Sequence, residues 1–175
     1  MAAIHQRHHE VSEAPAASQY LTFMLGSDVF AMDIRTVREI IQYGTMTTVP
    51  LMPSFVRGVI NLRGAVVPVI DLQARFGQPP AAVGRRTCIV VFDAVRNGER
   101  LELGLLVDAV SEVVDIPTSQ IEPPPSFGTS VRREFIHGMA KAAEGRFIVL
   151  LEPDKALDID EMAALCEVAQ EPVAA

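Results

Sequence analysis

Side chains with catalytic or metal-binding potential are few in this sequence, and they do not gather in a known constellation. His5, His8 and His9 could together bind a metal ion, but they lie in a stretch of His, Glu, Ser, Ala and Pro without periodicity. Such a stretch offers no fixed geometry for a metal. His137 stands by itself next to Gly138, a setting in which a structural or surface role is the more common one. We therefore predict no metal site and no cofactor.

An enzyme would need polar groups held together, such as a nucleophile with its base or two opposed carboxylates. The aspartates instead follow apolar runs, where strands meet turns and where Asp accepts backbone hydrogen bonds; they are Asp33, Asp71, Asp93, Asp108 and Asp115. The glycines form neither of the usual nucleotide-binding patterns. Cys88 and Cys166 lack the close spacing of a metal or redox motif, which indicates buried free thiols. The sequence therefore predicts a protein that is not an enzyme.

Arg63 is the polar residue that most needs an explanation. It interrupts the apolar stretch GVINLRGAVVPVIDL at residues 58–72, where a buried strand could not accommodate a cation. Together with Asn61 and Arg57 it lies in a short segment with apolar flanks, a composition typical of hot spots for protein recognition. The alternative is that Arg63 and Gly64 form the exposed turn of a hairpin in which the arginine is merely solvated. The residues by themselves leave both interpretations open.

The composition indicates a folded protein that does not bind nucleic acid. The chain has 175 residues, of which 49% are hydrophobic, enough for one ordinary domain or two small ones that share a core. Its formal net charge of −7, its aromatic content of 6% and its lack of tryptophan argue against binding to single-stranded nucleic acid. No apolar run approaches the roughly 20 residues of a membrane-spanning helix, and no export signal is visible at the N-terminus. We therefore expect a cytoplasmic protein without direct insertion in the membrane.

Alternating apolar residues predict two hairpins in the first half of the chain. After a disordered leader at 1–18, the segments YLTFML and VFAMDI are expected to be strands joined by the turn GSD. The second hairpin turns at Arg63-Gly64, and Pro68 places its strand at a sheet edge or a bulge. Between the hairpins, IRTVREII has the spacing of a short amphipathic helix, with a strand continuation as the alternative. PSFVRG and DLQARFG are each expected to form a short helical turn, capped in the second case by Gly77.

The second half of the chain repeats the first after the break QPPAAVG. TCIVVFDAV and LELGLLVDAV form another expected hairpin, for which Asn97-Gly98 is the strongest turn signal in the sequence. The positions that align between the halves include Glu39 with Glu112, Gly58 with Gly138 and Gly64 with Gly145. This duplication predicts two units of about five short strands, closed as small barrels that pack together or exchange strands. The segment DIDEMAALCEVA is expected to form a C-terminal helix at 158–169, followed by a tail at 170–175.

Three segments, FAMDIRTVREII, VRGVINLRGAVVPVIDL and LGLLVDAVSEVVDI, resemble the CheW family of coupling proteins in bacterial chemotaxis. The resemblance covers roughly residues 18–169 and is most specific in the NLRG tetrapeptide, which an apolar strand ending in Ile-Asp-Leu follows. It implies a mainly β fold of two intertwined five-stranded barrels of the SH3 type, with short helices and a C-terminal helix. The implied CheW-like domain spans 19–169, with subdomain 1 at about 30–84, subdomain 2 at about 19–29 and 85–157, and strand exchange between them.

The resemblance further implies an adaptor without catalytic activity or cofactor, which couples methyl-accepting chemotaxis receptors to the histidine kinase CheA in receptor arrays. In this family a groove between the barrels receives the cytoplasmic tip of the receptor, and the barrel ends bind the regulatory domain of CheA. The implied receptor-binding residues are Val37, Glu39, Asn61, Arg63 and Gly64, and the kinase-binding residues are left unassigned. Asn61 is expected to hold the turn in shape by bonding backbone groups.

Other functions stay open beside this one. The CheW fold also occurs as the regulatory domain of CheA, but this chain has no room for a kinase, phosphotransfer or receiver domain, which favours a stand-alone coupler. Related couplers serve pathways for gliding, pili or surface sensing, so a pathway other than flagellar chemotaxis is the first alternative. A small barrel that binds single-stranded nucleic acid is the second, and the acidic charge disfavours it. A small hydrolase is the third, although it would need a constellation that the sequence does not display.

Overall fold

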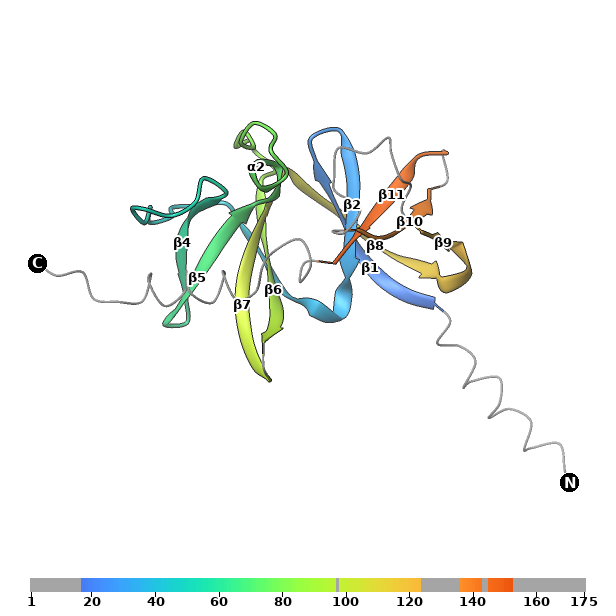
Figure 1. The fold of residues 1–175 in the computed structure, drawn as a ribbon, viewed down its shortest axis with the longest axis horizontal. Helices are drawn as coiled ribbons and strands as arrows, with labels where there is room; N and C mark the ends of the chain where they lie inside the picture. Colours follow the sequence, from blue (N-terminus) through green and yellow to red (C-terminus); the bar gives the residue numbers. More distant parts are fainter. Residues whose placement is uncertain (1–16, 97, 124–135, 143–144, 153–175) are drawn as a thin grey trace, which may run out of the picture.

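Two β-sheets make up most of the structure, a computed structural model that describes residues 17–96, 98–123, 136–142 and 145–152. The six-stranded sheet has the order β8 (Ala109–Pro117), β1 (Ala17–Leu25), β2 (Asp28–Asp33), β11 (Phe147–Leu151), β10 (Ile136–Lys141) and β9 (Ile121–Glu122). The five-stranded sheet has the order β3 (Val37–Gln42), β6 (Cys88–Arg96), β7 (Glu99–Val107), β5 (Ala65–Asp71) and β4 (Val56–Leu62). Three short helical elements connect strands: η3 (Ile34–Thr36) links the two sheets, α2 (Leu72–Arg75) lies between β5 and β6, and η4 (Thr118–Gln120) lies between β8 and β9. The two sheets lie side by side (Figure 1), and this mainly β architecture confirms the predicted fold class.

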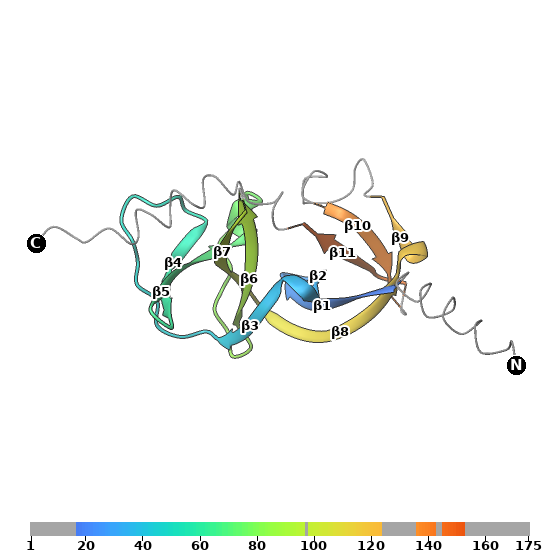
Figure 2. The same ribbon diagram turned by 90° about the horizontal axis from the view of Figure 1, so that it is seen from below.

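The two halves of the chain exchange strands between the sheets, which Figure 2 shows from a second direction. The hairpin β1–β2 of the first half pairs with β8 and β11 of the second, and the hairpin β6–β7 of the second half pairs with β3 and β5 of the first. One sheet takes residues 17–33 with 109–122 and 136–151, and the other takes 37–71 with 88–107. The reason is that a hairpin is a local unit and enters a sheet whole.

Each sheet is closed by a segment that brings its two edges together. Beyond β3, Thr47 forms an antiparallel bridge with Val59 of β4, so the edge strands of the five-stranded sheet meet. In the other sheet, β9 continues the chain of β8 after η4 and pairs with β10 through Glu122 and Met139. The two bridges are equivalent in the duplication, because Val59 follows Gly58 and Met139 follows Gly138. Both units are thus barrel-like, as the duplication predicts.

Gly58 and Gly138 lie where these closing segments approach most closely. A Cβ atom on Gly58 would lie 2.8 Å from the carbonyl oxygen of Thr47, and one on Gly138 would lie 2.9 Å from that of Glu122. Both distances are too short for a real Cβ contact, so each crossing needs a residue without a side chain. A shift in strand register accompanies each glycine, at Val56/Gly58 and at Ile136/Gly138. The aligned glycines therefore have the same structural role in both barrels.

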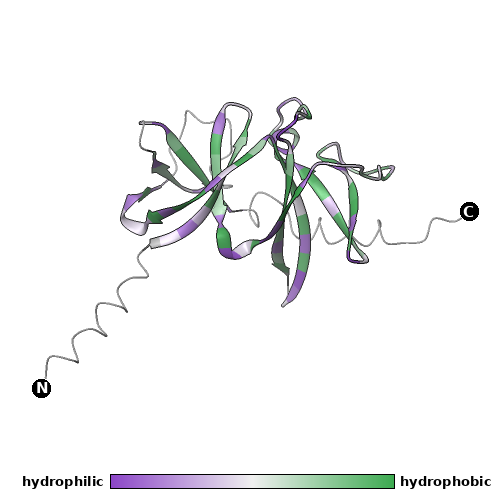
Figure 3. Ribbon diagram, turned by 180° about the vertical axis from the view of Figure 1, so that it is seen from behind, coloured by the Kyte–Doolittle hydropathy of each residue, from purple (hydrophilic) through white to green (hydrophobic). Residues whose placement is uncertain are grey.

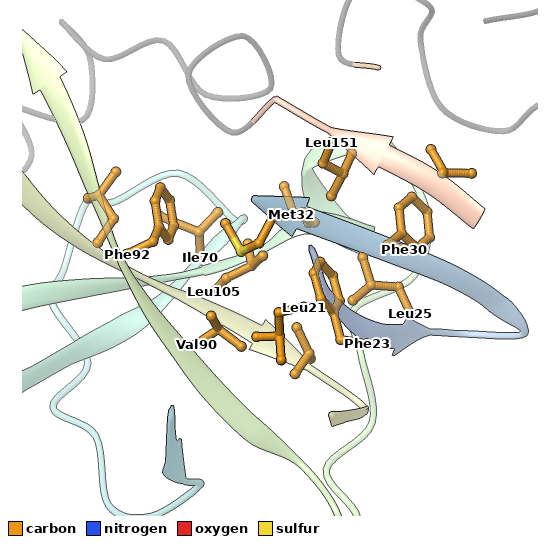
Figure 4. Packing of buried hydrophobic residues seen from close by; sticks show 14 of the residues in the cluster. Leu21, Phe23, Leu25, Phe30, Met32, Ile70, Val90, Phe92, Leu105 and Leu151 are labelled. Carbon is orange, nitrogen blue, oxygen red and sulfur yellow. The ribbon is translucent and has the colours of Figure 1, made fainter. Parts of the chain in front are cut away.

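One hydrophobic core joins the two sheets (Figure 4). Phe23, Phe30 and Met32 enter it from the six-stranded sheet, and Ile70 and Phe92 enter it from the five-stranded sheet. All five side chains are buried, and the burial of such large apolar groups is the main favourable term in folding. The shared core means that neither barrel has its apolar surface covered without the other.

Strand β6 explains why the chain contains continuous apolar runs as well as alternating ones. Successive side chains of a strand point to opposite faces. Val90 and Phe92 pack in the core that joins the sheets, whereas Ile89 and Val91 pack in a separate cluster of the five-stranded unit. Strands with one exposed face instead alternate in hydropathy, as several do in Figure 3. The central part of this run, residues 89–92, is therefore buried on both faces of the strand.

The segment IRTVREII is a strand where a helix was predicted. It begins with η3, whose N-cap Asp33 accepts a hydrogen bond from the backbone N–H of Arg35. From Val37 on it is β3, which pairs with β6. The helical prediction was wrong because β-branched side chains favour a strand and because β6 offers an edge to pair with. PSFVRG likewise forms one turn only, closed by a hydrogen bond from the Val56 N–H to the Pro53 carbonyl, and β4 begins at Val56.

Pro68 was expected at a sheet edge or a bulge: β5 is not an edge strand, since it lies between β7 and β4, but the β4–β5 ladder shifts register at Val56/Gly58, next to the Val59 that pairs with Pro68. Pro68 pairs with Val59, whose N–H and carbonyl group both bond to Thr47 on the other side of β4. The backbone nitrogen of Pro68 therefore points away from β4. On the β7 side, pairing begins one residue later, with Val69 opposite Gly104. Proline is tolerated inside this sheet because no partner needs a donor at that position.

The predicted hairpins and the predicted short helix are confirmed, whereas Cys88, expected to be buried, is partly exposed. The three predicted hairpins are present, and Arg96 faces Glu99 across the turn that contains Gly98. Helix α2 is capped by the Asp71 side chain and ends before Gly77, whose φ is +83°. Strand β1 begins at Ala17, so the last two residues of the predicted leader belong to it. The rest of the leader, the predicted helix at 158–169 and the tail lie outside the described residues.

Candidate functional site

Arg63 lies at the tip of the β4–β5 hairpin, in a two-residue turn between the paired residues Leu62 and Ala65. Arg63 has a φ of +51° and Gly64 a φ of +86°, which is the pattern of a type I′ turn. Asn61 stabilises this turn as predicted, because its Oδ1 accepts a hydrogen bond of 3.0 Å from the Gly64 N–H. Left-handed backbone is uncommon for a residue with a side chain. The turn therefore holds Arg63 in an unusual but well-defined place.

The side chain of Arg63 is 61% exposed, yet it is not merely solvated. Its Nη1 lies 2.6 Å from Oε1 of Glu39 on β3. The hydrogen bond to Glu39 raises the pKa of Arg63, and the charges of Glu39 and then Glu102 add to this effect. The hairpin interpretation and the recognition interpretation are thus compatible, because the arginine occupies an exposed turn and is held in place by a carboxylate from another strand.

The five residues expected at the receptor contact fall into two places in the fold. Asn61, Arg63 and Gly64 form the hairpin tip, and the ion pair brings Glu39 to it. Val37 precedes Glu39 by two residues on β3, where the strand shifts register against β6. Its side chain is partly buried and packs against the core that joins the sheets. Val37 therefore links this part of β3 to the core, whereas the other four residues are at the surface.

Sequence reasoning missed a network of charged residues beside this tip. Arg38 lies 3.3 Å from Asp93 and 3.8 Å from Glu102, and Arg63 also lies 3.8 Å from Glu102. Arg100 lies 3.7 Å from Asp93. The hairpin register could have indicated part of it, since counting back from the Asn-Gly turn places Asp93 opposite Glu102. Two carboxylates in one cross-strand pair are unfavourable unless cations lie between them, which is the position of Arg38.

Arg57 does not join Arg63, although both belong to the same short segment of sequence. Its Nη1 lies 3.1 Å from Oδ2 of Asp71 and donates to the carbonyl oxygen of Ala81 at 2.9 Å. Asp71 is fully buried and also accepts hydrogen bonds from the backbone N–H groups of Ala74 and Ala81. This arrangement satisfies a buried charge and fastens the loop after α2 to the barrel. The role of Arg57 is therefore structural.

Two open cavities lie elsewhere on the molecule. The larger, of about 660 Å³, is next to the start of β4 and is lined by Tyr43, Gly44, Thr45, Met46, Thr48 and Arg57. The smaller, of about 300 Å³, is lined by Thr22, Val29, Ser111, Glu112, Val114, Ala142, Arg146, Phe147 and Ile148. Neither has Arg63 or Glu39 in its lining. The exposed tip of the β4–β5 hairpin therefore lies outside both of these cavities.

The described part of the chain contains no group of three or more His, Cys, Asp or Glu side chains placed to hold a metal ion. The histidine with a described side chain, His137, has its Nδ1 2.7 Å from Oε1 of Glu152. Among the same residues, no helix has the length and apolar character needed to span a membrane.

Comparison with known proteins gives a consistent result. The family model of the CheW-like domain matches residues 19–161. The chain is 35% identical to the chemotaxis protein CheW of Klebsiella aerogenes over 152 residues, which cover 87% of this chain and 89% of that protein. It is 39% identical to the probable chemotaxis protein CheW of Rhizobium etli over 134 residues, which cover 77% of this chain and 83% of that protein.

A solved structure has the same fold. The crystal structure of the scaffolding protein TtCheW from Thermoanaerobacter tengcongensis superposes with a TM-score of 0.69 at 34% sequence identity. The match covers 77% of this chain and 84% of that chain. The motif that carries the resemblance, NLRG, is the one that builds the hairpin tip described above. On the family model, the relatives and the fold together, this chain belongs to the CheW family of chemotaxis proteins.

Proposed function

We propose that this protein is a non-catalytic adaptor that couples methyl-accepting chemotaxis receptors to the histidine kinase CheA. Its membership of the CheW family and the scaffolding role named for its structural relative support this proposal. The protein would act in the cytoplasm, where it would be recruited to receptor arrays. Its partners are the cytoplasmic tip of the receptor and the regulatory domain of the kinase.

The receptor contact is proposed to lie at Val37, Glu39, Asn61, Arg63 and Gly64. Val37 also packs against the shared core and so fixes the position of β3. The observation that carries this assignment is the exposed Arg63 guanidinium, which a strained turn and the carboxylate of Glu39 hold in one place. Binding is weakened by the entropy lost when mobile side chains become fixed. A guanidinium that is already fixed in the free protein loses less, and arginine is enriched among the side chains that dominate protein interfaces.

The kinase contact is proposed to lie at the barrel ends, away from the receptor contact, so that both partners bind at once.

The core that both sheets share supports a coupling role. Phe92 and Ile70 of one sheet pack in the same cluster as Phe23 and Met32 of the other. Because such cores are close-packed and resist deformation, a change of position in one barrel is transmitted to the other. Coupling then means that the two partners favour the same arrangement of the barrels.

The experiment is isothermal titration calorimetry with the full-length protein. The regulatory domain of CheA is added first, and a receptor-tip fragment is added to the resulting complex. We expect both to bind at micromolar strength. Arg63→Ala is expected to weaken receptor binding by about tenfold, a typical cost of losing a hot-spot side chain, and to leave kinase binding unchanged.

Arg85→Ala is the matched control, because Arg85 is an exposed arginine in the loop before β6. It should bind both partners as the wild type does. Binding of neither partner by the wild type would refute the adaptor function. Normal receptor binding by Arg63→Ala would refute the assignment of the receptor contact to the hairpin tip.

A further inference from the structure

Six charged side chains form a chain of alternating sign across the five-stranded sheet. In order they are Arg100, Asp93, Arg38, Glu102, Arg63 and Glu39, and the successive N···O distances are 3.7, 3.3, 3.8, 3.8 and 2.6 Å. Strands β7, β6 and β3 and the β4–β5 turn contribute these side chains. The chain of charges therefore connects the tip of the β4–β5 hairpin to side chains on β7, β6 and β3.

Glu39 is the acidic end of this chain of charges, and Arg100 is the basic end. Asp93 and Glu102 each lie between two arginines, whereas within the described residues the ion pair of Glu39 is with Arg63. The Glu39 side chain is 32% exposed and so is accessible to a partner. A cation from the partner would continue the alternation at this end. An anion would instead approach a site where two carboxylates already flank Arg63, which is unfavourable.

Glu102 has a carboxylate oxygen that lacks a donor. Its Oε2 is buried and makes no hydrogen bond within the described structure. Arg38 Nε and Arg63 Nη2 both lie 3.8 Å from it, which is beyond hydrogen-bond distance. Leaving a buried charged acceptor without a donor is costly. A movement of the exposed Arg63 guanidinium by about 1 Å would reach the roughly 2.8 Å of a charge-assisted hydrogen bond.

We propose that Glu102 is a positioning residue for the receptor contact: it takes up Arg63 when a basic side chain of the receptor binds Glu39. This inference rests on the proposed function, in which Glu39 and Arg63 contact the receptor tip. On binding, the lysine or arginine of the receptor pairs with Glu39, and the guanidinium of Arg63, still held by its turn, shifts by about 1 Å to form a hydrogen bond with Oε2 of Glu102. Glu39 and Glu102 then each have a cation, and Oε2 of Glu102 gains the donor that it lacked; Oδ1 of Asp93, which also makes no hydrogen bond within the described residues, is not affected. Arg63 thus has two alternative carboxylate partners.

The test is titration of a receptor-tip fragment into full-length Glu102→Gln, a substitution that keeps the size of the side chain and removes its charge. We expect the affinity to fall by about tenfold, because Arg63 loses its second charged acceptor. Glu99→Gln is the matched control, since Glu99 is an exposed residue on the same strand. It should bind as the wild type does, and both variants should retain the circular dichroism spectrum of the wild type.

The effect of Glu102→Gln must depend on Arg63. In an Arg63→Ala background we expect Glu102→Gln to cause no further loss of affinity; an equal loss in both backgrounds would overturn the proposal, since Glu102 would then act independently of Arg63. Arginine side-chain NMR adds a readout that a structural role would not move. The Nε–Hε resonance of Arg63 should shift on receptor binding in the wild type and should shift less in Glu102→Gln.

The charge of the receptor group is tested at Glu39. Glu39→Lys should bind the receptor more weakly than Glu39→Gln, and equal or tighter binding by the lysine variant would overturn the assignment of a basic receptor side chain.

Failure of this inference can be told from failure of the proposed function. If Arg63→Ala weakens binding and Glu102→Gln does not, the inference alone is wrong. If Arg63→Ala binds normally, the receptor contact itself lies elsewhere.

Discussion

Substitution of Gly58 by alanine tests how the five-stranded unit is closed. The new Cβ would lie 2.8 Å from the carbonyl oxygen of Thr47, so this oxygen would have to move by about 0.6 Å to reach an ordinary contact of 3.4 Å. That oxygen accepts a hydrogen bond of 2.8 Å from the Val59 N–H, and the Thr47 N–H donates to the Val59 carbonyl at 3.0 Å. These are the two hydrogen bonds of the closing bridge, and each contributes about 1 kcal/mol net.

We therefore expect Gly58→Ala to lower the free energy of unfolding by about 2 kcal/mol through loss of the bridge. Gly138→Ala should have a similar effect, because its Cβ would meet the carbonyl oxygen of Glu122 at the equivalent crossing. The control is Gly84→Ala, since nothing lies within 4 Å of a Cβ at that position. Urea unfolding followed by far-ultraviolet circular dichroism measures all three. Equal stability of Gly58→Ala and Gly84→Ala would refute the reasoning that the crossing requires glycine.

Three further predictions concern polar groups. Asp71→Ala should lower the free energy of unfolding by about 3 kcal/mol in urea unfolding, because it leaves the Arg57 cation without its carboxylate; a loss below 1 kcal/mol would show that the pair is dispensable. Asn61→Ala should cost about 1 kcal/mol of stability, by the same measurement, and should weaken receptor binding in calorimetry, because the turn loses its side-chain acceptor; unchanged receptor affinity would contradict the role of the turn. Hydrogen bonding to Arg35 lowers the pKa of Asp33, so this pair stabilises the fold above the ordinary Asp pKa and loses that effect as the pH falls through the lowered pKa. Arg35→Ala should thus be less stable than the wild type near pH 7 and equally stable at strongly acidic pH, and a difference that does not vary with pH would contradict it.

Local patterns were sufficient to predict the hairpins. Alternating apolar residues on either side of a turn signal identify β1–β2, β4–β5 and β6–β7, because the interactions that form a hairpin lie within about 20 residues of sequence. The Asn-Gly turn even determines that Asp93 faces Glu102. The role of Asn61 could be predicted for the same reason, since it bonds to a backbone group three residues away. The NLRG motif was sufficient to predict the family.

Other features depend on partners that are distant in sequence. The strand β3 was open to a helical interpretation until β6, about 50 residues later, supplied its pairing edge. The partner of Arg57 is 14 residues away and that of Arg63 is 24 residues away in the opposite direction, so their different roles could not be read from their common segment. The position of Pro68 inside a sheet depends on where the ladder with β7 begins.

The sequence by itself determined the three hairpins and their turns, that the chain is duplicated, and that the tip of the β4–β5 hairpin carries an arginine. Only the tertiary structure decided which hairpins the two halves exchange, which side chains enter the core that serves both sheets, and that Arg63 lies between Glu39 and Glu102. The physical reason is that backbone conformation follows from short-range sterics and hydrogen bonding, whereas strand partners and ion pairs follow from which surfaces meet when both halves bury their apolar faces together.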